Sequence, residues 1–126
     1  MAALILDTGA LIAIDRGDRR VGAMLHEAAR HRIDVITSSA CVAEAWRDPA
    51  RQARLARALA GVVERSLDPT AARECGMLLG RTRTSDITDA AIALLADADD
   101  VVLTSDAGDI EHLLDNTGTG AGIRAV

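Results

Sequence analysis

Short apolar runs alternate with longer stretches of helical spacing along the whole chain. The apolar runs are partly β-branched and indicate strands at residues 3–6, 33–37, 62–67, 101–104 and 123–126. Helical spacing of apolar side chains occurs at residues 9–16, 21–30, 40–47, 49–61, 69–80, 87–96 and 108–115. Because strands that alternate with helices form parallel sheets, the pattern predicts an α/β/α sandwich with a mostly parallel sheet of about five short strands.

Length and composition are typical of one globular domain, which we expect to span residues 1–126. There is no apolar run of roughly 18 residues, and no basic region precedes the apolar N-terminal stretch, so neither a membrane span nor a secretory signal is predicted. Cys41 and Cys75 match no metal-ligand or disulfide spacing, and we expect both to be small buried hydrophobes. These features favour a cytoplasmic protein.

The charge pattern excludes several kinds of phosphate and carbonyl chemistry. The net charge is −5, and all 14 basic residues are Arg, so the chain has no lysine for a Schiff base or a phosphate-binding loop. An acidic protein is a poor general binder of nucleic acid. If this chain handles phosphates, it needs a bridging cation or a local group of arginines.

Carboxylates stand where a parallel sheet would bring them together. In open α/β sheets, ligands bind at the carboxyl ends of the strands. Acidic residues follow three of the predicted strands or begin the helix before the fourth: Asp7, Glu44, Asp86, Asp89, Asp106 and Asp109. Clustered carboxylates repel one another unless a cation neutralises them, and an all-oxygen ligand set suits Mg²⁺ or Mn²⁺. Such cations mainly serve phosphate chemistry.

Helix capping is the structural alternative for most of these acids. Asp7 can cap the helix that follows it, and Asp86 with Asp89 can form an N-cap and its partner three residues on. Asp106 and Asp109 have the same spacing. For Glu44, the alternative is a surface glutamate on an alanine-rich helix. Taken singly, each pair fits a cap as well as a site.

Four sequence motifs resemble those of PIN-domain ribonucleases, and among these they are most similar to the VapC-type toxins. The motifs are LILDTGALIAI, AEAWR, TDAAIALLA and VVLTSDAGDI, in this order over nearly the whole chain. The resemblance implies a PIN-like fold and an acidic quartet that binds Mg²⁺ or Mn²⁺ and catalyses RNA hydrolysis: Asp7, Glu44, Asp89 and Asp106. It also matches Thr8 and Thr104 to polar residues beside the first and last acids. The roles of Asp86 and Asp109 stay open.

The resemblance further implies an RNA substrate, a VapB-like antitoxin as partner and a homodimer. Other functions remain open: an RNA-processing nuclease that is not a toxin, and a catalytically silent PIN-like binding module. A phosphoacceptor receiver domain would need a lysine after its last strand, and this chain has none. A haloacid-dehalogenase-type phosphatase would need a second aspartate where Gly9 stands.

Basic and aromatic side chains give weaker signals. Arg47, Arg51 and Arg54 recur at helical spacing and indicate either a solvated face or a surface for RNA or antitoxin. Trp46, the single aromatic residue, fits a core position or a partner-facing one. The three histidines are scattered, and we expect them at surface or cap positions.

Overall fold

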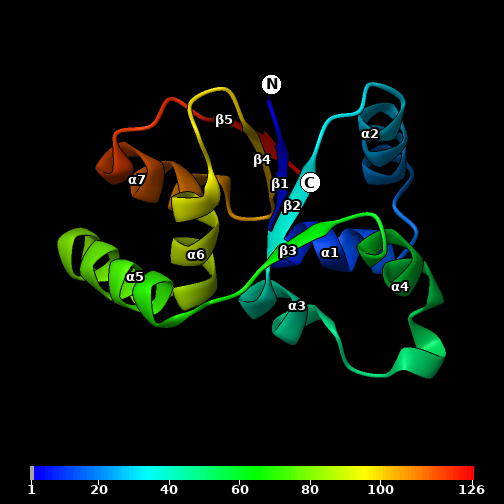
Figure 1. Ribbon diagram of the computed structural model, residues 1–126, viewed down its shortest axis with the longest axis horizontal. Coiled ribbons are helices and arrows are strands. Elements are labelled where there is room, and N and C mark those ends of the chain that lie inside the picture. The colour runs from blue at the N-terminus through cyan, green and yellow to red at the C-terminus, as the bar shows by residue number, and fades with distance from the viewer. Residues whose placement is uncertain (1) are drawn as a thin grey trace.

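Five parallel strands form the central sheet of the computed structural model, which describes residues 2–126 (Figure 1). They are β1 (Leu4–Leu6), β2 (Val35–Ser38), β3 (Val63–Arg65), β4 (Val101–Thr104) and β5 (Gly122–Ala125). The strand order is β3-β2-β1-β4-β5, and every neighbouring pair is parallel. The α/β class predicted from the sequence is confirmed, and the sheet is entirely rather than mostly parallel.

Helices cover both faces of the sheet. In residues 2–126 they are α1 (Thr8–Asp15), α2 (Arg19–Arg30), α3 (Ser39–Ala45), α4 (Ala53–Leu59), α5 (Pro69–Thr82), α6 (Ile87–Leu95) and α7 (Ala107–Thr117). Figure 1 shows α5, α6 and α7 on one side of the sheet and α1, α2 and α4 on the other. The arrangement is the α/β/α sandwich that the alternating pattern predicts.

The strand order places a crevice at the middle of the sheet. The chain builds outward from β1 through β2 to β3, then returns to the other side of β1 with β4 and β5. Ile5, Leu6, Val102 and Leu103 on the two central strands are fully buried, as expected of strands covered on both faces. In such sheets the ligand site lies where the order reverses, beyond the carboxyl ends of β1 and β4.

The segment 49–61, predicted as one helix, is divided at Gln52, so that prediction was wrong. A 3₁₀ turn spans Pro49–Arg51, and α4 follows it. The buried Gln52 side chain accepts a hydrogen bond from the Arg47 backbone N–H at 2.7 Å and donates one to the Ala45 carbonyl at 2.8 Å. These bonds tie the Gln52 side chain to the end of α3, and the Gln52 backbone has a non-helical conformation between the two helical turns.

The other predicted elements have ends within one or two residues of those observed. Both cysteines are buried, as predicted, and Trp46 is half-buried against the core. Among the described residues, no helix combines the length and apolar character that a membrane span requires.

Candidate metal centre

Asp7 joins the two central strands at their carboxyl ends. It directly follows β1, and its side chain is 3 % exposed. One carboxylate oxygen accepts a hydrogen bond from the Ala10 backbone N–H at 2.8 Å, which caps α1, and the other accepts one from the Ser105 backbone N–H at 3.2 Å. Asp7 is therefore both a helix cap and a carboxylate held at the crevice.

The environment of Asp7 disfavours its charge. Burial raises the pKa of this carboxyl group above its usual value. The Thr104 side chain and the two backbone N–H donors oppose that rise, because they stabilise the ionised form. The nearby charge of Asp106 adds a small further rise.

Gly9 allows α1 to approach the segment that follows β4. A Cβ atom at this position would collide with the side chain of Ser105. No side chain fits there without displacing that segment. Glycine at this position is therefore needed for the close contact between α1 and the segment after β4.

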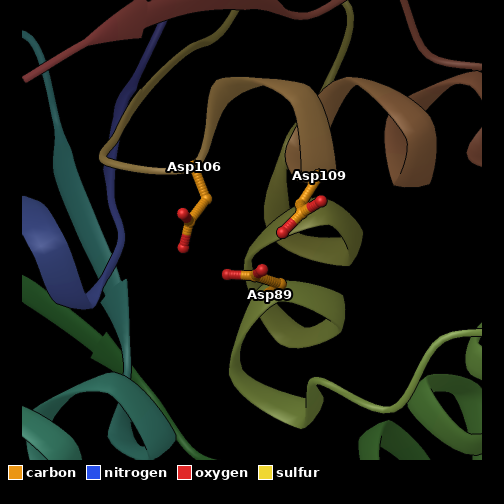
Figure 2. A group of neighbouring side chains, drawn as sticks. All are labelled: Asp89, Asp106 and Asp109. Atoms are coloured by element: carbon orange, nitrogen blue, oxygen red, sulfur yellow. The ribbon is translucent and has the colours of Figure 1, made fainter.

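Three carboxylates from α6 and the start of α7 lie close together (Figure 2). Asp89, Asp106 and Asp109 each offer one oxygen, and these oxygens all lie within 4.8 Å of one another. Figure 2 shows Asp89 on α6, with Asp106 and Asp109 at the start of α7, and their carboxylates directed toward a common space. Asp89 is 6 % exposed, whereas Asp106 and Asp109 are exposed.

The capping alternative holds for one pair of acids and fails for the other. Asp86 caps α6, because its side chain accepts hydrogen bonds from the Asp89 backbone N–H at 3.0 Å and from the Thr88 hydroxyl at 2.7 Å. Asp106 occupies the N-cap position of α7 but makes no side-chain cap bond. Its backbone N–H donates to the Thr104 hydroxyl at 2.8 Å, and its carboxylate stays available to a ligand.

The charge of this group is not neutralised within the protein. Burial, and after it the negative charges of Asp86, Asp106, Asp7 and Asp109 in that order of importance, together raise the pKa of Asp89 to about 7. Among residues 2–126, no Arg or His side chain forms a salt bridge with any of these carboxylates. An oxygen-only set of close, uncompensated carboxylates fits a hard divalent cation such as Mg²⁺ or Mn²⁺.

Glu44 stands beside this group rather than in it. It is exposed on α3, and its carboxylate accepts a hydrogen bond from the Thr8 hydroxyl at 2.8 Å. Burial raises the pKa of the Cys41 thiol to about 12, with smaller contributions from Asp7 and Glu44. The first and second acids of the predicted quartet thus lie near one buried thiol, under the carboxyl ends of β1 and β2.

The structure brings together two of the four predicted residues, Asp89 and Asp106, with Asp109, whose role the sequence left open. Asp7 and Glu44 lie outside the 4.8 Å group, although the charge of Asp7 acts on Asp89. The acid spacing already suggested Asp109 as a site residue. Helix capping predicts the same spacing, so the sequence alone did not distinguish a cap at Asp109 from a member of the cluster.

His112 also lies beside the cluster, and sequence reasoning assigned it no role there. Its ring lines a cavity of about 250 Å³ together with Asp86, Asp89 and Asp109. Its Nε2 atom lies 3.1 Å from the Thr82 carbonyl oxygen, close to the end of α5. This exposed, cap-like contact agrees with the predicted surface or cap position.

The predicted arginine face is partly engaged within the protein. Arg47 donates from its guanidinium to the Ala43 and Trp46 carbonyls at 2.8 and 2.7 Å, so it satisfies the end of α3. Arg51 forms an exposed salt bridge with Asp48 at 3.7 Å. Two of the three arginines of the predicted face, Arg47 and Arg51, therefore have partners within the protein.

Comparison with known proteins identifies the fold. No family model and no curated protein matches the sequence. A solved structure of VapBC2 from Rickettsia felis, bound to a DNA fragment from their promoter, contains a similar chain with a TM-score of 0.69 and 15 % sequence identity. The alignment covers 98 % of both chains. The chain therefore has the PIN-like fold that its motifs imply, the fold of a chain in a VapBC structure.

Proposed function

We propose that this protein is a metal-dependent endoribonuclease, the toxin of a toxin–antitoxin pair. The observation that carries the proposal is the set of three carboxylates, Asp89, Asp106 and Asp109, whose oxygens lie within 4.8 Å and which form no salt bridge with any of the described residues. Carboxylates this close repel one another, and a bound divalent cation would reduce that repulsion. The fold, shared with a chain of a VapBC structure, supports the same function.

Each residue has a distinct task in this proposal. Asp89, Asp106 and Asp109 would hold Mg²⁺ or Mn²⁺. Asp7, whose charge acts on Asp89, and Glu44, which is hydrogen-bonded to Thr8 next to Asp7, would complete the acidic site. When bound, the cation would lower the pKa of a water molecule and stabilise charge on the phosphodiester oxygens. Asp7 keeps α1 and the Ser105 segment together through its two hydrogen bonds. Thr8 orients Glu44, and Thr104 orients the backbone of Asp106.

The acidic surface explains why RNA binding would need the cation. With a net charge of −5 and acids at the crevice, the protein repels phosphates unless a divalent ion stands between them. The proposal includes a VapB-like antitoxin that suppresses the activity, a homodimer and a cytoplasmic location. The structural neighbour, a chain of VapBC2, supports the choice of partner.

Cleavage of a defined RNA by the purified protein tests the nuclease function. We expect cleavage in Mg²⁺ or Mn²⁺, loss of cleavage in chelator, and recovery when excess cation is restored. Wild-type and Asp89→Asn protein would be purified in parallel, so that a contaminating nuclease is recognised by equal activity in both. Cleavage that persists in chelator, or no cleavage with either ion, would contradict the proposal.

Expression in a bacterial host tests the toxin function separately. We expect growth arrest by the wild-type protein and rescue by co-expression of the small gene beside it. An RNA-cleaving protein whose expression leaves growth unchanged would instead be an RNA-processing nuclease. A folded protein that binds Mg²⁺ but cleaves no RNA would be a PIN-like binding module.

A further inference from the structure

The cavity of about 250 Å³ beside the carboxylates is lined by more than acids. Thr84 and Ser85, from the loop between α5 and α6, line it together with His112 of α7. Its volume is below the roughly 300–1,000 Å³ of sites for drug-sized ligands, so it suits a single ring system. Asp89 also lines it, is 6 % exposed and bonds to Asp86 through its backbone N–H, so its carboxylate remains for a ligand.

The loop that forms one side of the cavity is held at both ends. The chain turns at Arg83, which has a left-handed backbone conformation with φ 56°. The Thr84 backbone N–H then donates to the Leu79 carbonyl at 3.2 Å, and the Thr84 hydroxyl lies 2.8 Å from that of Thr82. At the other end, Asp86 caps α6. A side of this kind is already in place before a ligand binds.

The directions of the hydrogen bonds leave acceptors on the lining. The buried Thr82 hydroxyl donates its one hydrogen to the Leu78 carbonyl at 3.0 Å, so Thr84 is the donor in the bond between the two hydroxyls, and its oxygen can still accept. The Thr82 carbonyl can only accept, so His112 donates to it from Nε2, and in the neutral ring Nδ1 is then an acceptor. Both bonds to the Asp86 carboxylate end on Oδ1, which leaves Oδ2 for a further donor.

We propose that this cavity binds the base of the RNA nucleotide next to the cleaved phosphate and selects guanine. Guanine carries a ring N–H and an amino group side by side on its Watson–Crick edge, and the acceptors of the lining match these donors. Uracil presents a single N–H between two carbonyl oxygens, which the same acceptors disfavour. The Ser85 hydroxyl can donate to the carbonyl oxygen of guanine. This inference rests on the proposed nuclease function.

The position of the cavity relates the base to the reacting phosphate. Asp89 and Asp109 belong both to the lining and to the group of three carboxylates (Figure 2). A phosphate held at a cation on these carboxylates therefore has the cavity directly beside it. The imidazole ring of His112 is the aromatic group of the lining, and aromatic side chains, including histidine, stack on unpaired bases.

Cleavage of RNAs that differ in one base tests the selection. After the cut position is mapped, the nucleotide on each side of it is replaced in turn by guanosine, inosine or uridine. At one of the two positions, we expect guanosine to be cleaved at least about 10-fold faster than inosine or uridine. Inosine lacks only the amino group of guanosine, so the comparison keeps size and stacking nearly constant. Equal rates for guanosine and inosine at both positions would overturn the inference.

Two variants assign the selection to this cavity. Thr84→Val removes the acceptor oxygen at nearly constant shape and should reduce the ratio of guanosine to inosine cleavage by about 5-fold. His112→Ala should slow cleavage of both RNAs by about 10-fold, because stacking does not depend on the amino group. An unchanged ratio in Thr84→Val, or wild-type rates in His112→Ala, would contradict the assignment.

Matched controls lie outside the cavity. Thr70→Val replaces an exposed residue at the start of α5, and His26→Ala replaces an exposed residue on α2. Both should keep the wild-type rates and the wild-type ratio. Circular dichroism and thermal unfolding of all four variants establish that the fold is intact.

Binding of single nucleotides separates this inference from the nuclease proposal. In Mg²⁺, calorimetry should show guanosine monophosphate binding at least about 10-fold more tightly than inosine or uridine monophosphate. If the wild type binds with this preference but cleaves no RNA, the nuclease proposal fails and the base site stands. If it cleaves RNA without any base preference, the base site fails and the nuclease stands. Two Mn²⁺ ions per chain, with no nucleotide preference, would show that the cavity holds a second cation instead.

Discussion

The two ends of the sheet carry opposite chemistry. At the carboxyl ends, Asp7, Asp89, Asp106 and Asp109 accumulate negative charge without a salt bridge from the described residues. At the amino ends of β1 and β4, an apolar groove is lined by Arg20 and Arg124, neither of which forms a salt bridge with another residue in the range 2–126. The two ends therefore differ in charge and polarity: close carboxylates lie at one end, and apolar side chains beside two arginines lie at the other.

The direction of the helices contributes to this difference. α1, α3 and α7 begin directly after β1, β2 and β4, so their N-termini meet at the carboxyl ends of the strands. A helix N-terminus offers unpaired N–H groups and a partial positive charge, which favour acidic side chains. These donors bind Asp7, yet the pKa of Asp89 remains raised to about 7. The helices thus reduce the repulsion without cancelling it.

The largest expected effect is on catalysis at the carboxyl ends. Replacing Asp89, Asp106 or Asp109 by Asn removes one ligand charge at nearly constant shape, and we expect RNA cleavage to fall by at least about 100-fold in each case. Rates in excess Mg²⁺ and in Mn²⁺ measure it. Asp115→Asn, exposed on the same helix as Asp109, is the control and should cleave at the wild-type rate.

Among these three substitutions, Asp109→Asn is the most informative test of the site. The sequence left it open as a cap or outer group, for which Asn would reduce cleavage only modestly. Its place in the 4.8 Å group predicts a loss as large as that of Asp89→Asn. A modest loss would move Asp109 out of the metal centre and leave the site with two close carboxylates.

The next effect concerns the close approach that joins α1 to the end of β4. We expect Gly9→Ala to lower the free energy of unfolding by about 1–3 kcal/mol, because the added methyl group collides with Ser105. Gly76→Ala is the matched control: nothing lies within 4 Å of its Cβ position on α5, so it should raise stability by about 0.5–1 kcal/mol. Urea unfolding of both variants measures the contrast, and equal effects would contradict it.

A third prediction concerns how the stability of the metal-free protein depends on pH. The pKa of Asp89 is about 7 in the folded protein against 3.8 as its ordinary value, so between these values the folded state binds a proton that the unfolded state lacks. Stability therefore falls as pH rises from about 4 to 7 and stays low above it. Thermal unfolding in chelator between pH 5 and 8 measures the fall.

Asp89→Asn should flatten this pH dependence, because Asn carries no charge at any pH. It should also raise the melting temperature of the metal-free protein at pH 8 by a few degrees, since it removes a charge that burial and four neighbouring acids disfavour. Adding Mg²⁺ to the wild type should have the same direction of effect. If the wild-type protein instead gains stability from pH 5 to 8 in chelator, other groups of the protein neutralise the charge of these carboxylates.

The smallest effect concerns Asp86, whose side chain caps α6 beside the cluster. Asp86→Asn should change stability by only a few tenths of a kcal/mol, because Asn accepts the same bond from the Asp89 backbone N–H. Asp86→Ala should cost about 1 kcal/mol. Chemical unfolding compares the two, and an equal loss of cleavage in both would show that Asp86 belongs to the metal centre.

Most of the fold follows from the sequence because the relevant signals are local. Apolar β-branched runs and helical spacing predicted every strand and all the helices but one, with ends within two residues. The exception is the 49–61 segment, where Gln52 satisfies backbone groups of Arg47 and Ala45. An amide side chain that binds backbone across a loop leaves no periodic pattern, so only the folded chain shows it.

The candidate site, too, was determined partly by the sequence and partly by the tertiary structure. By itself, the sequence determined that carboxylates follow the strands and that lysine chemistry is absent, and it predicted that a cation or a group of arginines would be needed if the protein handles phosphates. Only the tertiary structure decided that Asp86 caps its helix while Asp106 does not, and that Asp109 rather than Asp7 or Glu44 shares the 4.8 Å group. The apolar groove at the amino ends of β1 and β4 likewise arises from segments far apart in sequence. A cap and a ligand have the same residue type and spacing, and they differ only in where the carboxylate points after the helices have packed on the sheet.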